Sequence, residues 1–333
     1  MTRVFRLAIL AGFLAGLVAG APAAAHAQDS AAPQDSTVSM DVLHAEGLYK
    51  DGHFKEAIAL LSKYLAAHPQ DVKALVDRGD AYEALNDQKS AVADYTAALT
   101  LNPDYAYALA SRCESLHELE RNVAALADCN KAIDLAPKLA YPRRERALIE
   151  LANGDVQAAL ADANKALEIA PDDAFSLAER CRIYVALGRN DDAVADCNGA
   201  LAINPDEEMA FFHRGRAEIK LKNYDKAVSD FNSVLKLDPN ESGAYYWLAV
   251  AKLDDGSYAD ALKDVDSYIK ANDDDADGHL LRAQIEQKLG NVGEARTSAT
   301  TALRHYRIDN DTAGAALAQK MLDSLSAGAA PQP

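Results

Sequence analysis

The side chains in this sequence that could act as acid and base are arginines and aspartates that recur at a fixed interval. Arginine occupies one recurring position, at Arg78, Arg112, Arg146, Arg180, Arg214 and Arg282. Aspartate follows sixteen residues after each of the first five, with one more an interval further on, at Asp94, Asp128, Asp162, Asp196, Asp230 and Asp264. An acid beside a base is an arrangement that proton-transfer catalysis uses. Repetition in five places nevertheless favours a structural role.

The expected location of these charges also favours structure. Both sets fall on helix faces that should be packed, so each charge needs a partner. An aspartate could pair with the arginine of its own repeat or with that of the next, and both arrangements give the same number of pairs. A guanidinium group has five N–H donors and can contact two carboxylates. We therefore predict a continuous ladder of arginine and aspartate that fixes the register between repeats.

The four cysteines follow the same spacing. Each directly follows an arginine or aspartate of the ladder, and each pair is separated by sixteen residues, Cys113 from Cys129 and Cys181 from Cys197. In a helical hairpin that turns midway between them, the two cysteines of a pair lie at the same height on facing helices, close enough for a disulfide. We predict disulfides 113–129 and 181–197 over the other connectivities. Four buried thiols are the alternative.

Residues that commonly catalyse reactions or bind cofactors form no pattern. The histidines are scattered without the spacing of metal ligands. The sequence contains no glycine-rich phosphate loop and no Gly-x-Ser-x-Gly motif. Repeats, with short segments at each end, account for nearly the whole chain and leave no length for a catalytic domain. We therefore expect no enzymatic activity, no cofactor and no metal site.

Prolines show the interval of the whole pattern. They recur 34 residues apart, each after a segment rich in Ala and Leu, at Pro69, Pro103, Pro137, Pro171, Pro205 and Pro239. Proline ends a helix because it lacks a backbone N–H and disfavours helix in the residue before it. A period of 34 residues is that of a helix-turn-helix repeat. One position of the second helix is always alanine, from Ala57 to Ala295 in steps of 34, which allows helices to approach closely.

This combination of small residues, aromatic residues, alanine and proline resembles the tetratricopeptide repeat (TPR). The segment from Asp71 to Asp104 is close to the family pattern throughout. The resemblance extends over 38–309 and implies an all-α fold, a right-handed α-solenoid of eight helix-turn-helix units. The expected units start at residues 38, 72, 106, 140, 174, 208, 242 and 276.

The ends of the array depart from this pattern. The last two units have Asp273 and Arg307 where the earlier units have proline. Atypical terminal units are expected in a solenoid because each has solvent on one side. Apolar residues at helical spacing predict a capping helix over 310–326, followed by a loose tail over 327–333.

The first residues have the composition of a secretory signal peptide. Two arginines precede an apolar run from Leu7 to Gly20, and Ala25-His26-Ala27 is a small-x-small cleavage signal. This run is shorter than the ~20 residues that span a bilayer, although an uncleaved anchor is the alternative. We predict a signal peptide over 1–27, a flexible lead-in over 28–37, and a secreted, periplasmic protein that is not inserted in a membrane.

The chain is strongly acidic. Its formal net charge is −17, and cleavage after residue 27 changes this to −19 because the signal peptide holds two arginines and no acid. Such a charge argues against nucleic acid and anionic lipid surfaces as partners, since both repel an acidic protein. A basic partner would be attracted, although an acidic surface also serves solubility alone.

The TPR resemblance implies that the first helices line a concave face, which in this family commonly holds an extended peptide or a partner helix. The side chains expected there change from acidic in the early units to basic and aromatic in the middle ones. The expected partner-binding residues are Tyr107, Tyr141, Arg144, Phe175, Arg182, Phe212, Arg216, Tyr246 and Trp247. We therefore expect a non-catalytic scaffold that binds a protein or peptide. The alternative is a structural component of a cell-envelope assembly or secretion complex, and the oligomeric state stays open.

Overall fold

The structure, a computed structural model, describes residues 39–327, and over that range its regular elements are all helices. They form two compact units, one of residues up to Ser176 and the other of residues from Leu177 on. The division falls inside α10 (Ala174–Ala186). The signal peptide and lead-in predicted at 1–27 and 28–37 lie outside the described residues, as does the predicted tail beyond its first residue.

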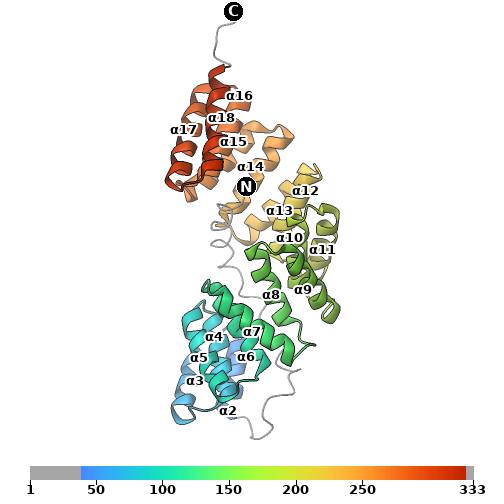
Figure 1. The fold of residues 1–333 in the computed structure, drawn as a ribbon, viewed down its shortest axis with the longest axis vertical. Helices are drawn as coiled ribbons and strands as arrows, with labels where there is room; N and C mark the ends of the chain where they lie inside the picture. Colours follow the sequence, from blue (N-terminus) through green and yellow to red (C-terminus); the bar gives the residue numbers. More distant parts are fainter. Residues whose placement is uncertain (1–38, 328–333) are drawn as a thin grey trace, which may run out of the picture. The chain divides into compact units, whose positions relative to one another are not determined.

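The N-terminal unit consists of four helical hairpins that stack in the order of the chain (Figure 1). Its helices are α2 (Met40–Lys50), α3 (Phe54–Ala67), α4 (Val72–Glu83), α5 (Gln88–Leu101), α6 (Ala106–Glu118), α7 (Asn122–Leu135), α8 (Tyr141–Asn153) and α9 (Val156–Ile169). The first helix of each hairpin packs against its own second helix and against the second helix of the hairpin before it. This is the nearest-neighbour packing of a solenoid.

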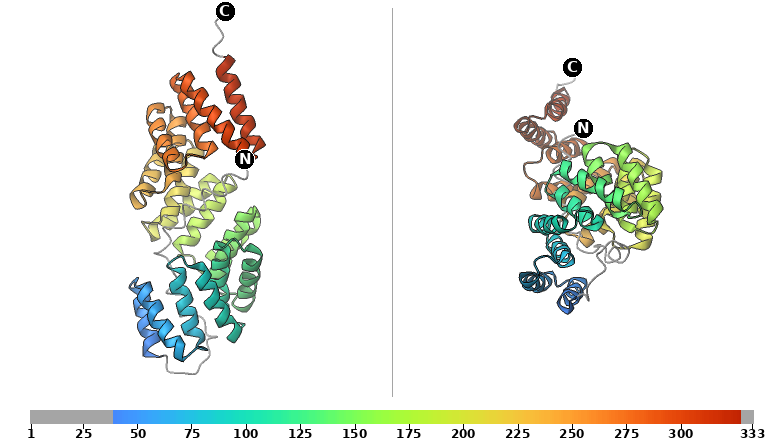
Figure 2. Two further views of the ribbon diagram at one scale, coloured as in Figure 1. Left: turned by 90° about the vertical axis from the view of Figure 1, so that its left-hand side faces the viewer. Right: turned by 60° about the horizontal axis from the view of Figure 1, so that its bottom comes forward.

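The C-terminal unit continues the same pattern after α10, as two further views show (Figure 2). Its helices are α11 (Asn190–Ile203), α12 (Glu208–Lys220), α13 (Tyr224–Leu237), α14 (Ser242–Asp255), α15 (Tyr258–Ala271), α16 (Ala276–Leu289), α17 (Val292–Ile308) and α18 (Thr312–Ala327). The last helix, α18, packs on α17 and α16, where the sequence predicts a capping helix. The fold is therefore the all-α solenoid that the sequence predicts.

The helix ends explain the repeat length. Most second helices are 14 residues long and end two residues before a proline or its equivalent position, as α5 does before Pro103. The exception is α17, which runs for 17 residues through Arg307 because no proline stands there. Turns within hairpins use left-handed backbone, at glycines such as Gly154 (φ 89°) and also at Glu120 and Lys222, where the sequence gives no glycine signal.

The two helices of a hairpin approach each other at one position, where their side chains are complementary in size. A β-carbon added to Gly79 would lie 2.6 Å from the ring of Tyr95, and one added to Gly215 would lie 2.8 Å from the ring of Phe231. Other hairpins fill the equivalent positions with Ala45 and Leu61, Cys113 and Cys129, Ala147 and Ala163, Cys181 and Cys197, Ala249 and Val265, and Ala283 and Ala299. An aromatic ring therefore occurs on the second helix only opposite glycine.

The cysteines occupy these close positions. The sulfur atoms of the two predicted pairs lie at bonding distance, 2.06 Å for Cys113 and Cys129 and 2.07 Å for Cys181 and Cys197. All four side chains are buried. Each disulfide thus joins the two helices of one hairpin, in place of the ring and glycine used elsewhere.

Arginine pairs with the aspartate of its own hairpin. Arg78 donates from Nε and Nη2 to the two oxygens of Asp94, each at 2.7 Å, and the next four hairpins repeat this bidentate pair. The prediction that each arginine also contacts the carboxylate of a neighbouring repeat is wrong. Nη1 instead donates to a neutral side chain of the hairpin before, as Arg214 does to Asn198 at 2.6 Å. A carboxylate that accepts two N–H groups is already compensated, so a neutral acceptor suffices between hairpins.

The ladder changes near the end of the array. Asp264 has no arginine in its hairpin and pairs with Lys252 at 2.6 Å. Arg282 contacts Asp266 of the preceding hairpin at 3.3 Å and Glu286 of its own helix at 3.0 Å. The two charges that own-repeat pairing leaves over therefore find other partners.

Candidate functional site

In the N-terminal unit, carboxylates of the first helices form a cluster with tyrosine hydroxyls. The hydroxyl of Tyr95 lies 2.7 Å from Asp80 and 3.2 Å from Glu83. Tyr107 donates to the second oxygen of Asp80 at 3.2 Å, and Ser115 donates to Glu83 at 2.7 Å. These hydroxyls are uncharged donors, so they position the carboxylates without neutralising them.

Burial and mutual repulsion perturb the acids of this cluster. Burial, followed by the charges of Glu114 and Asp80, raises the pKa of Glu83 well above its ordinary value. Burial and then Glu114 raise the pKa of Glu118 to about 7. Tyr141 donates its hydroxyl proton to Glu114. The face formed by α4 and α6 is therefore acidic, and a cation from outside would lower this repulsion.

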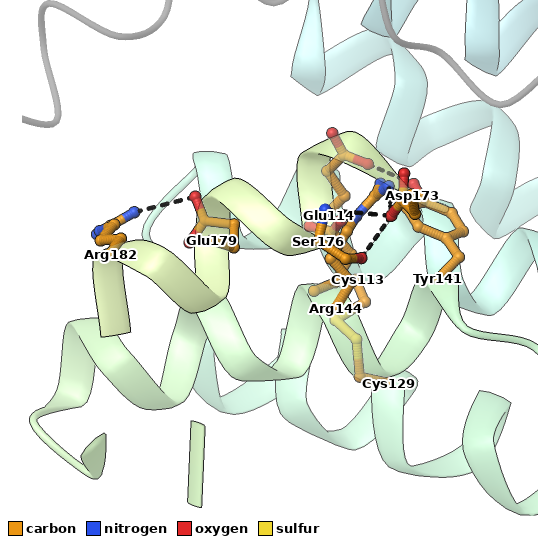
Figure 3. A network of polar contacts seen from close by, with 10 residues as sticks. Cys113, Glu114, Cys129, Tyr141, Arg144, Asp173, Ser176, Glu179 and Arg182 are labelled. Carbon is orange, nitrogen blue, oxygen red and sulfur yellow. Dashed lines mark hydrogen bonds and ion pairs between the residues drawn. A yellow bond between two sulfur atoms is a disulfide. The ribbon is translucent and has the colours of Figure 1, made fainter. Parts of the chain in front are cut away.

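Arg144 of α8 is held by side chains of its own unit (Figure 3). It lies 3.0 Å from Glu145 and 3.7 Å from Asp173, and its guanidinium stacks over the rings of Tyr141 at 4.9 Å and Phe175 at 4.6 Å. The neighbouring carboxylates raise its pKa although burial opposes them. Arg144 is thus neutralised within the unit and organises the two rings, which leaves it little free charge for a partner.

In the C-terminal unit, the corresponding face is basic. Arg182 of α10 contacts Glu179 one turn earlier at 3.5 Å (Figure 3). Arg216 of α12 stacks over the ring of Trp247 of α14, with 4.9 Å between its Cζ and the ring centroid. Burial, followed by the charge of Arg182, lowers the pKa of Arg216 to about 10. Among the described residues, no acceptor lies within hydrogen-bond distance of the buried Nε of Arg216.

His213 lies on α12 beside these arginines. Its side chain is buried, and burial together with the charges of Arg216 and Arg182 lowers its pKa well below the ordinary value. It is therefore neutral at physiological pH and adds no positive charge to this face.

The expected partner-binding residues fall into two groups. Tyr107, Tyr141 and Phe212 are buried, with exposed fractions of 4, 6 and 1%, and they pack within their units. The other side chains retain partial exposure, namely Arg144, Phe175, Arg182, Arg216, Tyr246 and Trp247. Only the second group offers surface to a partner in this conformation.

Sequence reasoning missed two residues that belong to this face. Glu179 moderates the charge of Arg182, and His213 separates the arginines from the interior. A signal was present, because both occupy a single position of the first helix that also contains Glu145 and Trp247, in steps of 34. Comparing equivalent positions in all units would have placed them together.

Other kinds of site were sought in the part of the chain that the structure describes. No group of three His, Cys, Asp or Glu side chains within 39–327 could hold a metal ion. None of the described helices is both long and apolar enough to span a bilayer. A cavity of about 320 Å³ lies beside the ladder pair Arg214 and Asp230 and is lined largely by polar side chains of α11 to α13.

Comparison with known families agrees with this architecture. Models of the tetratricopeptide repeat match residues 42–106, 88–140, 179–242 and 218–285. Together these segments cover more than half of the chain. The chain belongs to the tetratricopeptide repeat family. TPR proteins are generally non-catalytic scaffolds for protein interactions, and no enzymatic family matches.

Solved TPR structures share the fold at low sequence identity. A tetratricopeptide repeat protein from Parabacteroides merdae is 20% identical, with a TM-score of 0.56 over 77% of this chain and 99% of its own. The APC/C hetero-tetramer Cut9–Hcn1 contains a chain that is 14% identical, with a TM-score of 0.70 over 86% of this chain and 55% of its own. A human IFIT1 dimer with m7Gppp-AAAA is 19% identical, with a TM-score of 0.55 over 80% and 71%. No curated protein sequence matches the chain.

Proposed function

We propose that this TPR protein is a secreted, periplasmic scaffold without chemistry of its own, which binds a protein or peptide along the first helices of its units. The observation that carries the proposal is a reversal of charge at one position of those helices. The position holds Asp80 and Glu114 in the N-terminal unit and Arg182 and Arg216 in the C-terminal unit. A partner with complementary charges would be selected and oriented by such a surface.

The ladder and the disulfides support a scaffold role. Bidentate arginine–aspartate pairs and two buried disulfides stiffen the hairpins that present this surface. A surface that is already rigid loses less conformational entropy when it binds a partner. Disulfides also persist in oxidising compartments, which agrees with export to the periplasm.

Capture from an envelope extract tests the binding role. The mature chain, residues 28–333, is immobilised, and the retained proteins are compared with those retained by R182E/R216E. The matched control is K226E/K263E, which changes the charge equally at exposed lysines of α13 and α15. We expect a partner that wild type and control retain and that R182E/R216E does not. Equal retention by all three would contradict the proposed surface.

Two simpler measurements test the remaining parts of the proposal. Fractionation of cells that express the whole chain should recover a protein beginning at Gln28 in the periplasm. Size-exclusion chromatography with light scattering should give a monomer for an adaptor that binds other proteins. A stable oligomer would favour a structural component of an envelope assembly instead.

A further inference from the structure

Two arginines two residues apart on α12 have opposite surroundings. Arg214 forms a bidentate pair with Asp230, at 2.9 and 2.7 Å, and hydrogen bonds to this carboxylate raise its pKa. Arg216 pairs with no carboxylate among the described residues, and its environment lowers its pKa. An arginine that only supports the fold would be expected to resemble Arg214.

The surroundings of Arg216 are unfavourable for its charge in the free protein. Arg182 contributes a second positive charge nearby, and the buried Nε–H of Arg216 has no acceptor within the described chain. The ring of Trp247 provides one favourable contact through its negative face. Such a charge is retained at a stability cost, which an anion bound from outside would offset.

The residues that surround Arg216 also limit the charge of that anion. Arg182 and Arg216 contribute two positive charges, and Glu179 contributes one negative charge through its contact with Arg182. His213 is neutral because burial and both arginines lower its pKa. The net charge of the group is therefore about +1, which a single carboxylate matches and a phosphate dianion exceeds.

From this arrangement we propose that Arg182, Arg216 and Trp247 form a binding site for a carboxylate of an extended peptide, with an apolar or aromatic neighbour of that carboxylate packed on Trp247. This inference rests on the proposed function and specifies the chemistry of its partner. The guanidinium of Arg216 is partly exposed and can donate to a carboxylate from outside. The carboxylate can be a peptide C-terminus or the side chain of Asp or Glu.

The test uses the mature chain and four probes. They are a peptide with a neutral sequence and a free C-terminus, the same peptide amidated, the amidated peptide with one internal Asp, and inorganic phosphate. Binding is followed by the fluorescence of Trp247, the single tryptophan, and by the NMR signal of the Arg216 Nε–H, assigned with R216K. We expect saturable changes with a carboxylate peptide. Binding of the free C-terminus and of the internal Asp distinguishes the two sources.

Variants separate a ligand site from a structural arginine. R216M should weaken binding of the carboxylate peptide at least tenfold, because hydrogen bonds to a charged partner are lost. It should also raise Tm, since it removes an uncompensated charge. R214M, the matched control on the same helix, should lower Tm and leave peptide affinity within twofold. Circular dichroism of both variants confirms that the fold is kept.

Three results would overturn the inference. These are equal binding of the amidated neutral peptide, saturable binding of phosphate but of neither carboxylate peptide, and a fall in Tm for R216M as large as that for R214M. The scaffold role is judged separately, by capture from the envelope extract. A partner that R216M still retains would reject the carboxylate site and leave the scaffold proposal standing.

Discussion

The close position between the helices of a hairpin allows a quantitative test at Gly215. A β-carbon there would lie 2.8, 3.0 and 3.0 Å from three atoms of the Phe231 ring. Phe231 has an exposed fraction of 0%, so its ring cannot move into solvent. G215A should therefore strain the packing of α12 against α13.

The size of this effect follows from a matched glycine in the same unit. Gly199 also lies within a helix, and its added β-carbon would meet only Leu177, at 3.4 Å. Alanine gains about 1 kcal/mol over glycine in a helix interior at both sites, so this gain cancels in the comparison. Overpacking costs about 1–3 kcal/mol. We expect G215A to be less stable than G199A by about that amount.

A second substitution should relieve the strain. F231V added to G215A reproduces the pair Ala249 and Val265 found at the equivalent positions of the next hairpin. F231V alone leaves space beside Gly215 and should destabilise the unit. The double-mutant cycle should therefore show a favourable coupling of about 1 kcal/mol or more.

Urea unfolding followed by Trp247 fluorescence measures these differences, because Trp247 lies on α14 beside the hairpin tested. The reasoning would be refuted if G215A matched G199A in stability, or if F231V destabilised G215A as much as it destabilises wild type. Either result would mean that the recurrence of small residues does not reflect ring packing.

Three further predictions concern the disulfides, the acidic cluster and the ladder. C113A/C129A should lose about 3 kcal/mol of stability under oxidising conditions, the value for a loop of this length, and reductant should lower Tm of wild type but change this variant less. Since the pKa of Glu118 is raised in the folded state to about 7, the fold favours its protonated form; that stabilisation is full below about pH 4.5 and lost as pH rises through 7, so E118Q should raise Tm at pH 8 and leave it unchanged at pH 4. R180L leaves Asp196 without its bidentate partner and should lower stability by about 1–3 kcal/mol, whereas R180L/D196L should recover part of this loss. An unchanged melting profile for R180L would contradict the structural role of the ladder.

The sequence alone contained most of the fold because each repeat states the same pattern again. Proline positions, invariant alanine and the cysteine spacing all depend on local packing that recurs every 34 residues. The extent of α17 was less clear, because the absence of proline at Arg307 does not show where a helix then ends. Left-handed turns at Glu120 and Lys222 likewise carry no residue signal.

The candidate site was predicted less completely. Charge on the first helices could be read from the repeat register, but pairing could not, because it depends on side chains that meet between hairpins. Arg144 and Arg216 both carry charge near aromatic rings, yet Arg144 meets Glu145 and Asp173 whereas Arg216 meets Trp247 and Arg182. The difference between a compensated and an uncompensated arginine therefore needed the structure.

The central claim is that the first helices, and not the second helices, bind the partner. Site-specific photocross-linking in an envelope extract tests it most directly, with the photoreactive residue placed at Val250 or at Leu237. Val250 follows Arg216 by one repeat on the first helix α14, whereas Leu237 ends the second helix α13 and is exposed. The account predicts a cross-linked partner at Val250 and none at Leu237. A partner cross-linked at Leu237 alone, or equally at both positions, would contradict it.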